Sequence, residues 1–223
     1  MGTAIEVVHL GLVPYREVWR LQHDCHARCR ITGENILLLT EHDPIVTLGY
    51  RRPREQLLSV TTLEQEGIAI VEVERGGGAT YHGPGQLVAY PIFSTLFRSW
   101  GVRKFITRLE TVMGQVSQSF NVRTVQRPGF PGVWVGGRKL GAVGIAVRSG
   151  VSLHGFALNV NIDLRPFSHI VPCGLRECGV TSLKQEVGET IEMRTVVAQT
   201  CRAFSAVFTV PIQERTYEWG SVE

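Results

Sequence analysis

In the segment RGGGATYHGPGQLVAYPI, residues 75–92, five glycines fall within the first eleven residues. Glycine loses more conformational freedom on folding than any other residue, so such a cluster indicates backbone that needs positive φ or a close approach. The run QLVAYPIF that follows is typical of a strand. A phosphate-binding loop or a dinucleotide fingerprint needs a helix directly after its glycines, so the segment fits neither class of nucleotide site.

The glycine segment is instead predicted to join two strands by a broad, glycine-lined turn. Such a turn can bring backbone N–H groups close to a ligand, with Tyr81 and His82 at its rim. The alternative is a bulged hairpin that needs positive φ at several positions. Because Arg75, Tyr81 and His82 share one short loop, we favour a binding site.

Length and composition indicate one globular domain over residues 1–223, because no repeat, low-complexity tract or linker divides the chain. The net charge of +3 comes without a clustered stripe of lysine and arginine, so no nucleic-acid partner is expected. No apolar run reaches the length of a membrane span, and no secretory signal is recognised. Five cysteines in such a chain are predicted to be free thiols in the cytoplasm.

Apolar periodicity predicts the order of the elements. Strands are expected at residues 6–13, in two runs within 34–51 broken at Asp43-Pro44, at 68–75, at 87–93, in a hairpin over 133–147 with Gly136-Gly137 at its turn, and at 151–163. Helices are expected at residues 14–31, 53–67, 102–120 and 189–208. Strands outnumber helices and do not alternate strictly with them. The predicted fold class is therefore mixed α/β (α+β), with a largely antiparallel central sheet flanked by helices.

Lys139 follows the turn of the predicted hairpin. Counting by twos from it reaches Gly141, Val143, Ile145 and Val147, so a regular strand would point the lysine inward with the apolar side chains. Desolvation there would favour the neutral amine. The alternative is that the glycine turn or a bulge shifts the register and leaves Lys139 in solvent. By the same parity, His154 is interpreted as a core or rim histidine rather than a catalytic one.

Cys173 lies between Pro172 and Gly174 in irregular chain, where a loop can present its thiol. A neighbouring lysine or histidine would lower the pKa of such a thiol and make it a nucleophile. Cys178 has similar flanks but lacks the preceding proline.

The other cysteines carry weaker signals. Cys25 and Cys29 lie four residues apart on one predicted helix face with His26 between them. These residues are of types that bind metals, but no second pair of ligands accompanies the CHARC segment. The simpler interpretation is that the two cysteines pack on the buried face of the helix. Cys201, in an apolar helix, is predicted to belong to the core.

Four motifs occur in a fixed order: RGGGATYHGPGQLVAYPI, GRKLGAVGIAV, SLHGFALNVNID, and IVPCGL followed by VTSL. With these motifs the chain resembles the lipoyl (octanoyl) transferases of lipoate biosynthesis. The resemblance spans roughly the middle half of the sequence. It implies the fold shared with biotin and lipoate protein ligases, with the active site in a cleft over the sheet.

The resemblance also implies a reaction. An octanoyl group would pass from octanoyl-acyl carrier protein to the lysine amine of apo lipoyl domains, as found in the E2 subunits of 2-oxoacid dehydrogenases and in the glycine cleavage H protein. Cys173 would carry the acyl group as a thioester, and Lys139 would lie beside it. The acyl pocket would be lined by Arg75, Gly76, Gly77, Gly78, Ala79, Thr80, Tyr81, His82, Ala142, Val143, Gly144, Gly155, Phe156 and Ala157. The glycines would let backbone lie along the acyl chain, where any Cβ would collide.

A thioester donor is already activated, so neither ATP nor another cofactor nor a metal is expected. Lys139 could favour the Cys173 thiolate as a cation and accept a proton from the attacking lysine as a neutral amine. Three alternatives stay open: an ATP-dependent lipoate–protein ligase, an amidotransferase that moves lipoyl groups between domains, and a non-catalytic acyl-binding protein.

Overall fold

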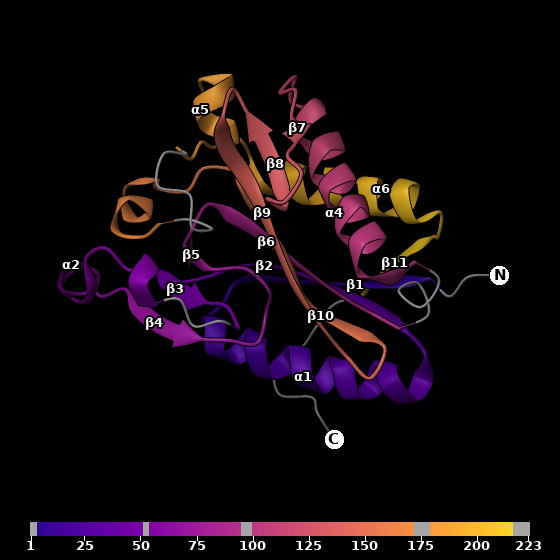
Figure 1. Ribbon diagram of the computed structural model, residues 1–223. Coiled ribbons are helices and arrows are strands. Elements are labelled where there is room, and N and C mark those ends of the chain that lie inside the picture. The colour runs from indigo at the N-terminus through magenta and orange to yellow at the C-terminus, as the bar shows by residue number, and fades with distance from the viewer. Residues whose placement is uncertain (1–3, 51–53, 95–99, 172–178, 216–223) are drawn as a thin grey trace.

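The computed structural model describes residues 4–50, 54–94, 100–171 and 179–215, and they form two sheets (Figure 1). The eight-stranded sheet has the spatial order β11 (Ile212–Arg215), β1 (Ile5–Leu12), β2 (Asn35–Glu41), β6 (Gln86–Phe93), β10 (Val151–Asn159), β9 (Arg138–Arg148), β8 (Gly132–Val135) and β7 (Val125–Gln126). The three-stranded sheet has the order β4 (Ala69–Glu72), β3 (Ile45–Leu48) and β5 (Ala79–His82). Only β11–β1, β1–β2 and β3–β4 pair in parallel among these strands. The predicted mixed, largely antiparallel fold is confirmed.

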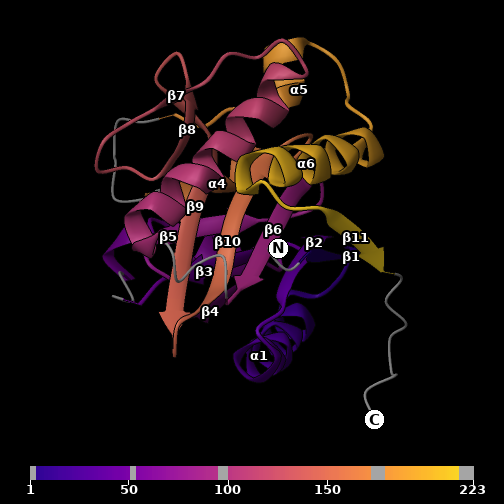
Figure 2. The same cartoon turned by 90° about the vertical axis from the view of Figure 1, so that its right-hand side faces the viewer.

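Helices cover both faces of the large sheet (Figures 1 and 2). The helix α1 (Tyr15–Thr32) lies on one face, and α4 (Gly101–Gln118) and α6 (Met193–Phe208) lie on the other. In β2, Ile36 and Leu38 pack in the cluster with α1, whereas Leu37 and Leu39 pack with α4 and α6. Burial of both faces explains why this strand is apolar at successive positions. No described helix combines the length and apolar character that a membrane span requires.

The small sheet has its own apolar cluster at one end of the large one. Short helical segments pack against it: η1 (Arg54–Gln56), α2 (Val60–Gln65) and η2 (Arg165–His169). Leu48 of β3, Leu63 of α2 and Phe167 of η2 are buried in this cluster. A further short helix, α5 (Leu183–Val187), packs instead with the large sheet, because its Leu183 belongs to the core cluster there. The small sheet therefore has an apolar core of its own.

The predicted hairpin is confirmed, since Gly136 and Gly137 have φ of 51° and 86°, which a two-residue turn of this kind requires. The helix predicted over residues 53–67 is instead two short pieces. Ser59 separates them, because its hydroxyl accepts a hydrogen bond from the backbone N–H of Thr62 and caps the second piece. The strand predicted over residues 68–75 is limited to Ala69–Glu72.

The glycine segment differs from the prediction of one broad turn. The glycines 76–78 connect β4 to β5, but these two strands do not pair with each other, because β3 lies between them. A second turn, Gly83-Pro84-Gly85, then carries the chain from the small sheet into β6 of the large sheet. The segment therefore contains a strand of its own and crosses between the two sheets.

Replacement of Phe204 by alanine is predicted to destabilise the fold by about 3–5 kcal/mol, the usual cost of emptying a large aromatic site. Phe204 is fully buried on α6, and its ring centroid lies 5.5 Å from that of Phe208 and 6.0 Å from that of Phe156. Urea unfolding would measure the loss. Leu12→Ala, at a side chain that is 60% exposed, should change stability by less than about 0.5 kcal/mol. Equal effects would contradict this account of the core.

Candidate functional site

A pocket lies between the glycine loop 76–78 and the β9–β10 hairpin, and the space of about 480 Å³ that it frames is partly open to solvent. Of the residues predicted to line an acyl pocket, all except Tyr81 line this one. Four further residues contribute side chains to the lining: Tyr15, Val88, Tyr90 and His154.

Tyr81 points away from the pocket. Its ring packs edge-on against Phe167 at a centroid distance of 5.5 Å, inside the cluster of the small sheet. Residues on a strand alternate between two faces, so Thr80 and His82 face the pocket and Tyr81 does not. The same alternation in β6 would have identified Val88 and Tyr90 as lining residues once β6 was known to pair with β10. Nothing in the sequence places Tyr15, at the start of α1, beside them.

Hydrogen bonds hold the glycine loop against both sheets. The backbone N–H of Gly76 donates to the carbonyl of Ile145 on β9 at 2.9 Å. The guanidinium of Arg75 donates from Nη2 to the carbonyl and the hydroxyl of Thr47 on β3, at 2.7 and 2.8 Å. At the other end of the loop, the N–H of Ala79 donates to Oε1 of Gln56 at 2.8 Å. The loop is therefore a fixed wall of the pocket.

Contacts within the protein require glycine at several positions around the pocket, and the prediction that the glycines make room for an acyl chain stays a prediction. A Cβ on Gly78 would overlap the side-chain amide of Gln56. A Cβ on Gly144 would lie 2.9 Å from the carbonyl oxygen of Gly76, and one on Gly155 would overlap the carbonyl of Ala89. Gly77 has φ of 86°, a conformation that strains any other residue.

Lys139 is buried, with 5% of its surface exposed, but not for the predicted reason. Val143, Ile145 and Val147 pack toward α4 and α6, and a regular strand would place Lys139 on that same face. Instead the lysine lies against Trp134, with Nζ 4.9 Å from the ring centroid and 3.3 Å from the carbonyl oxygen of Pro131. The Lys139 side chain therefore lies on the opposite face of the sheet from the one that strict alternation along the strand predicts.

A β-bulge causes this reversal. Val133 pairs with Gly141, and the next residue, Trp134, pairs with Lys139, so Leu140 has no opposite residue. Leu140 and Gly141 both face the α4 side, since Leu140 belongs to that core cluster and a Cβ on Gly141 would lie 2.7 Å from Sδ of Met113. The extra residue turns Lys139 to the other face. The sequence-based alternative included a bulge, but one that exposed the lysine.

The face that Lys139 occupies adjoins the pocket. A smaller cavity lined by Lys139 shares Thr80, Ala142 and Ala157 with the main pocket. Glu110 of α4 is also buried here and accepts a hydrogen bond from the N–H of Gly132 at 2.8 Å. Burial raises the pKa of Glu110, and the backbone N–H of Gly132 and the charge of Lys139 oppose that rise. The lysine is thus placed beside one end of the pocket.

Cys173 lies outside the described residues, as does Cys178. The chain on either side of this gap is held at the site. Before it, the N–H of Val171 donates to the carbonyl of Gln56 at 2.7 Å. After it, the N–H of Lys139 donates to the carbonyl of Gly179 at 2.9 Å, and the N–H of Thr181 donates back to the carbonyl of Lys139 at 3.0 Å.

Two histidines that are uncharged at neutral pH lie between Tyr15 and Tyr90: His82 lines the pocket, and the ring of His42 packs against Tyr15, His82 and Tyr90. Burial lowers the pKa of His82 to about 3 and that of His42 to about 4. Nε2 of His42 lies 2.8 Å from the hydroxyl of Tyr90, and the ring of Tyr15 stacks on that of His82. Burial also raises the pKa of both tyrosines. An uncharged wall of this kind suits an apolar ligand.

Charge is concentrated at the end of the pocket away from Lys139. His154, which has φ of 57°, lines the pocket, and its Nε2 lies 3.5 Å from Oε2 of Glu74. The Glu74 carboxylate also accepts from Trp19 Nε1 at 3.2 Å and pairs with His23 Nε2 at 2.9 Å. Burial alone would raise the pKa of Glu74, but the hydrogen bonds and the nearby histidines lower it to about 2. The carboxylate is therefore ionised and ties the start of the glycine loop to α1 and β10.

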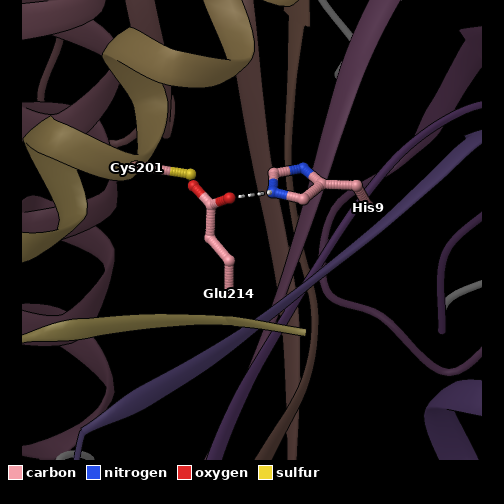
Figure 3. A group of neighbouring side chains, drawn as sticks. All are labelled: His9, Cys201 and Glu214. Atoms are coloured by element: carbon pink, nitrogen blue, oxygen red, sulfur yellow. Dashed lines mark ion pairs between the residues drawn. The ribbon is translucent and has the colours of Figure 1, made fainter. Parts of the chain in front are cut away.

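The residues described include one group of close metal-ligand types, His9 of β1, Cys201 of α6 and Glu214 of β11 (Figure 3). Their ligand atoms lie within 4.8 Å of one another, and His9 Nε2 is 4.0 Å from Glu214 Oε2. Burial raises the pKa of the Cys201 thiol to about 11, so the thiol is protonated. The group is explained as an exposed His–Glu ion pair beside a core cysteine. It lies at the β11–β1 edge, away from the pocket between β9 and β10.

The positions of Cys25 and Cys29 agree with the prediction that they pack on the buried face of their helix. Both lie in or against the cluster between α1 and the large sheet, and the thiol of Cys29 donates to the carbonyl of Ile92 at 3.5 Å. Burial raises the pKa of each thiol to about 12. Cys201 is buried in the core on the opposite face, as predicted.

Replacement of Glu74 by glutamine is predicted to lower the free energy of unfolding at neutral pH, and to lower it less as the pH falls toward 2. The pKa of Glu74 is 4.5 when unperturbed and about 2 in the folded protein, so the stabilisation is present above pH 4.5 and is lost as pH falls toward 2. The difference in unfolding free energy between wild type and Glu74→Gln should reach at most about 3 kcal/mol at neutral pH and shrink toward pH 2. Urea unfolding at a series of pH values would measure it. A difference that does not change with pH would contradict the assignment.

Comparisons with known proteins agree on the kind of protein this site belongs to. Residues 14–205 match the family described as "Lipoyl protein ligase A/B catalytic domain". The chain is 44% identical over 210 residues to an octanoyltransferase from Roseiflexus sp. (strain RS-1), covering 92% of this chain and 87% of that protein. It is 40% identical over 209 residues to an octanoyltransferase from Caldicellulosiruptor saccharolyticus, covering 92% and 88%. The crystal structure of lipoate-protein ligase A bound with ATP has a TM-score of 0.80 at 19% identity, over 98% of this chain and 90% of that one, which shows a shared fold.

Proposed function

The chain belongs to the lipoyl protein ligase A/B catalytic family, and on this premise we propose that it is an octanoyltransferase. Its donor would be octanoyl-acyl carrier protein, and its acceptors would be the lysine amines of apo lipoyl domains, in E2 subunits of 2-oxoacid dehydrogenases and in the glycine cleavage H protein. The observation that carries the proposal is the position of Lys139. It is buried beside a largely apolar pocket, and its backbone pairs with the chain that directly follows the Cys173 segment.

In the first half-reaction, the Cys173 thiolate attacks the carbonyl carbon of the carrier-bound thioester. A tetrahedral oxyanion forms, the bond to the carrier sulfur breaks, and the carrier leaves as a thiol after taking a proton. Lys139, as a cation, stabilises the Cys173 thiolate and can supply that proton. One thioester replaces another, so the step is nearly balanced in free energy and needs no ATP.

In the second half-reaction, the amine of the acceptor lysine attacks the Cys173 thioester. The neutral Lys139 amine accepts the proton that the attacking nitrogen must lose, the carbon–sulfur bond breaks, and an amide forms. Conversion of a thioester to an amide is downhill. Backbone N–H groups must stabilise the oxyanion in both halves, because each passes through a tetrahedral intermediate.

The pocket supports an acyl substrate. It extends along β9 and β10 from the Ala142–Ala157 pair beside Lys139 to the Gly144–Gly155 pair near His154. Its wall is largely apolar, and His82, which faces it, is uncharged at neutral pH. An aliphatic chain can therefore lie in it with the reacting carbonyl at the Lys139 end.

The direct test is the intact mass of the protein after mixing with octanoyl-acyl carrier protein alone. An octanoyl adduct is expected, which hydroxylamine removes, which Cys173→Ser lacks, and which apo lipoyl domain discharges. Transfer without an adduct would replace the thioester intermediate by direct attack in a ternary complex. Failure of both adduct and transfer would reject the proposed function.

Replacement of Lys139 by arginine is predicted to reduce turnover by at least about 10²-fold, the usual contribution of a positioned acid–base group. Arginine keeps the charge but cannot give up its proton at accessible pH, so the second half-reaction should lose more than the first. Single-turnover rates of adduct formation and discharge would separate the two, and thermal unfolding would confirm that the variant is folded. Normal discharge by Lys139→Arg would contradict the dual role.

The competing activities have separate tests. A lipoate–protein ligase would form an acyl adenylate from free octanoate and ATP, and would not need Cys173. An amidotransferase would accept a lipoyl-lysine amide as donor. A non-catalytic acyl-binding protein would hold octanoyl-acyl carrier protein without discharging it. Transfer from the carrier thioester without ATP, lost in Cys173→Ser, distinguishes the proposed function from all three.

A further inference from the structure

A chain of hydrogen bonds between side chains runs from the glycine loop to the backbone beside Lys139. Arg75 donates to the Thr47 hydroxyl, which lies 3.4 Å from His82 Nε2. His82 Nδ1 lies 2.7 Å from Gln86 Oε1, and Gln86 Nε2 donates to Asn159 Oδ1 at 2.9 Å. Asn159 Nδ2 then donates to the carbonyl of Thr181 at 2.9 Å. The last side chain in the chain thus contacts the segment that pairs with Lys139.

The direction of the chain is fixed by its two ends. Arginine can only donate, and the carbonyl of Thr181 can only accept. The Thr47 hydroxyl therefore donates to His82 Nε2, His82 carries its proton on Nδ1, and each amide has one orientation that satisfies both of its neighbours. Gln86, Asn159 and Thr181 are at most 4% exposed, so a broken link would leave a buried polar group without its partner.

Asn159 stands where β10 leaves β9. The two strands pair as far as Leu158 and Gly141, after which the Gly179–Thr181 segment takes the place of β10 beside Lys139. The backbone of Lys139 holds this segment on one side through its N–H and carbonyl. The Asn159 amide holds it on the other side through the Thr181 carbonyl.

We propose that Asn159 is a positioning residue for acyl transfer, because it fixes the register of Gly179–Thr181 against Lys139. The proposal rests on the proposed function for its kinetic consequence, but the positioning itself can be measured without activity. A displacement of about 1 Å in a reacting group can cost on the order of 10² in rate, so loss of this anchor should slow acyl-enzyme formation by that order. The affinity for octanoyl-acyl carrier protein should change much less.

Asn159→Asp gives the sharpest test, because its effect depends on pH. When ionised, the aspartate presents an acceptor to the Thr181 carbonyl, which is also an acceptor, so the link is lost. When protonated, its O–H can donate and restore the link. Burial raises the pKa of such a carboxyl, so the rate of acyl-enzyme formation should be recovered at low pH and fall as pH rises through that pKa. Asn159→Ser has no titrating group there and should be slow at every pH.

Asn161 provides a matched control two residues further along the chain. Its Nδ2 donates to the carbonyl of Ile191 at 2.7 Å, and its Oδ1 accepts from the N–H of Ile191 at 3.0 Å. It therefore makes the same kind of side-chain link to a distant backbone segment, but to one that does not pair with Lys139. Asn161→Asp and Asn161→Ser should keep the wild-type pH profile of acyl-enzyme formation.

Hydrogen exchange at the backbone N–H groups of Lys139 and Thr181 tests the positioning independently. Both should exchange faster in Asn159→Ser than in wild type, and Asn161→Ser should leave them unchanged. Unchanged exchange in Asn159→Ser, or an Asn159→Asp pH profile parallel to that of wild type, would overturn the proposal. If wild type forms no acyl-enzyme, the proposed function fails, and the exchange measurement still decides whether Asn159 positions this segment.

Discussion

Arg75 and Gly76 together link the two sheets of this protein at the glycine loop that forms one wall of the pocket. Arg75 is 8% exposed, and a charge so deeply buried is tolerated only when hydrogen bonds replace its water. Thr47 of the small sheet supplies two acceptors, and the next residue, Gly76, bonds to Ile145 of the large sheet. Glu74, the residue before Arg75, is held ionised by hydrogen bonds and by the charges of His154 and His23. Loss of this junction would separate the glycine loop from the floor of the pocket.

The site separates its charges from its apolar surface. Lys139 lies at one end of the pocket and the Glu74–His154 pair at the other, and between them the charged side chain of the lining is Arg75, whose guanidinium is hydrogen-bonded to Thr47. Burial is the main cause that keeps His42 and His82 neutral, so these side chains do not change their charge near neutral pH. An acyl chain can thus be desolvated between the two charged ends without burying an unpaired charge.

A buried polar network connects these parts. It runs from Arg75 through His82 and Gln86 to Asn159, along the walls of the pocket and of the smaller cavity beside Lys139. Because the donor at one end and the acceptor at the other fix the direction of each bond between them, a change at one end affects whether the groups at the other end keep their hydrogen bonds. The loop that shapes the pocket and the strand that carries Lys139 are therefore set by the same interactions.

Periodicity identified much of the fold because it reports how each element packs. The strands, the three long helices and the Gly136-Gly137 turn follow from apolar spacing and from glycine's access to positive φ. The same reasoning was wrong where local chain geometry departs from a regular period. Strict alternation assigned Lys139 to the wrong face of the sheet, because nothing in the sequence identifies Leu140 as the extra residue of a bulge. Tyr81 was grouped with the pocket because residues 75–82 were interpreted as one loop, whereas residues 79–82 form the strand β5, whose alternation turns Tyr81 into the neighbouring core.

The four motifs and their order are properties of the sequence, and the family assignment follows from them. The sequence also limits the chemistry, since glycines that lead into a strand cannot form a helix-based phosphate site. What surrounds the glycines at the pocket was decided only by the tertiary structure, where Gly78 fits against Gln56, Gly144 against Gly76 and Gly155 against Ala89. The tertiary structure alone also decided the positions of Lys139 and Asn159. Lys139 depends on a bulge, and Asn159 on the replacement of β10 by the Gly179–Thr181 segment beside Lys139. Both features depend on contacts between residues far apart in the chain. Such contacts leave no periodic signal in the sequence.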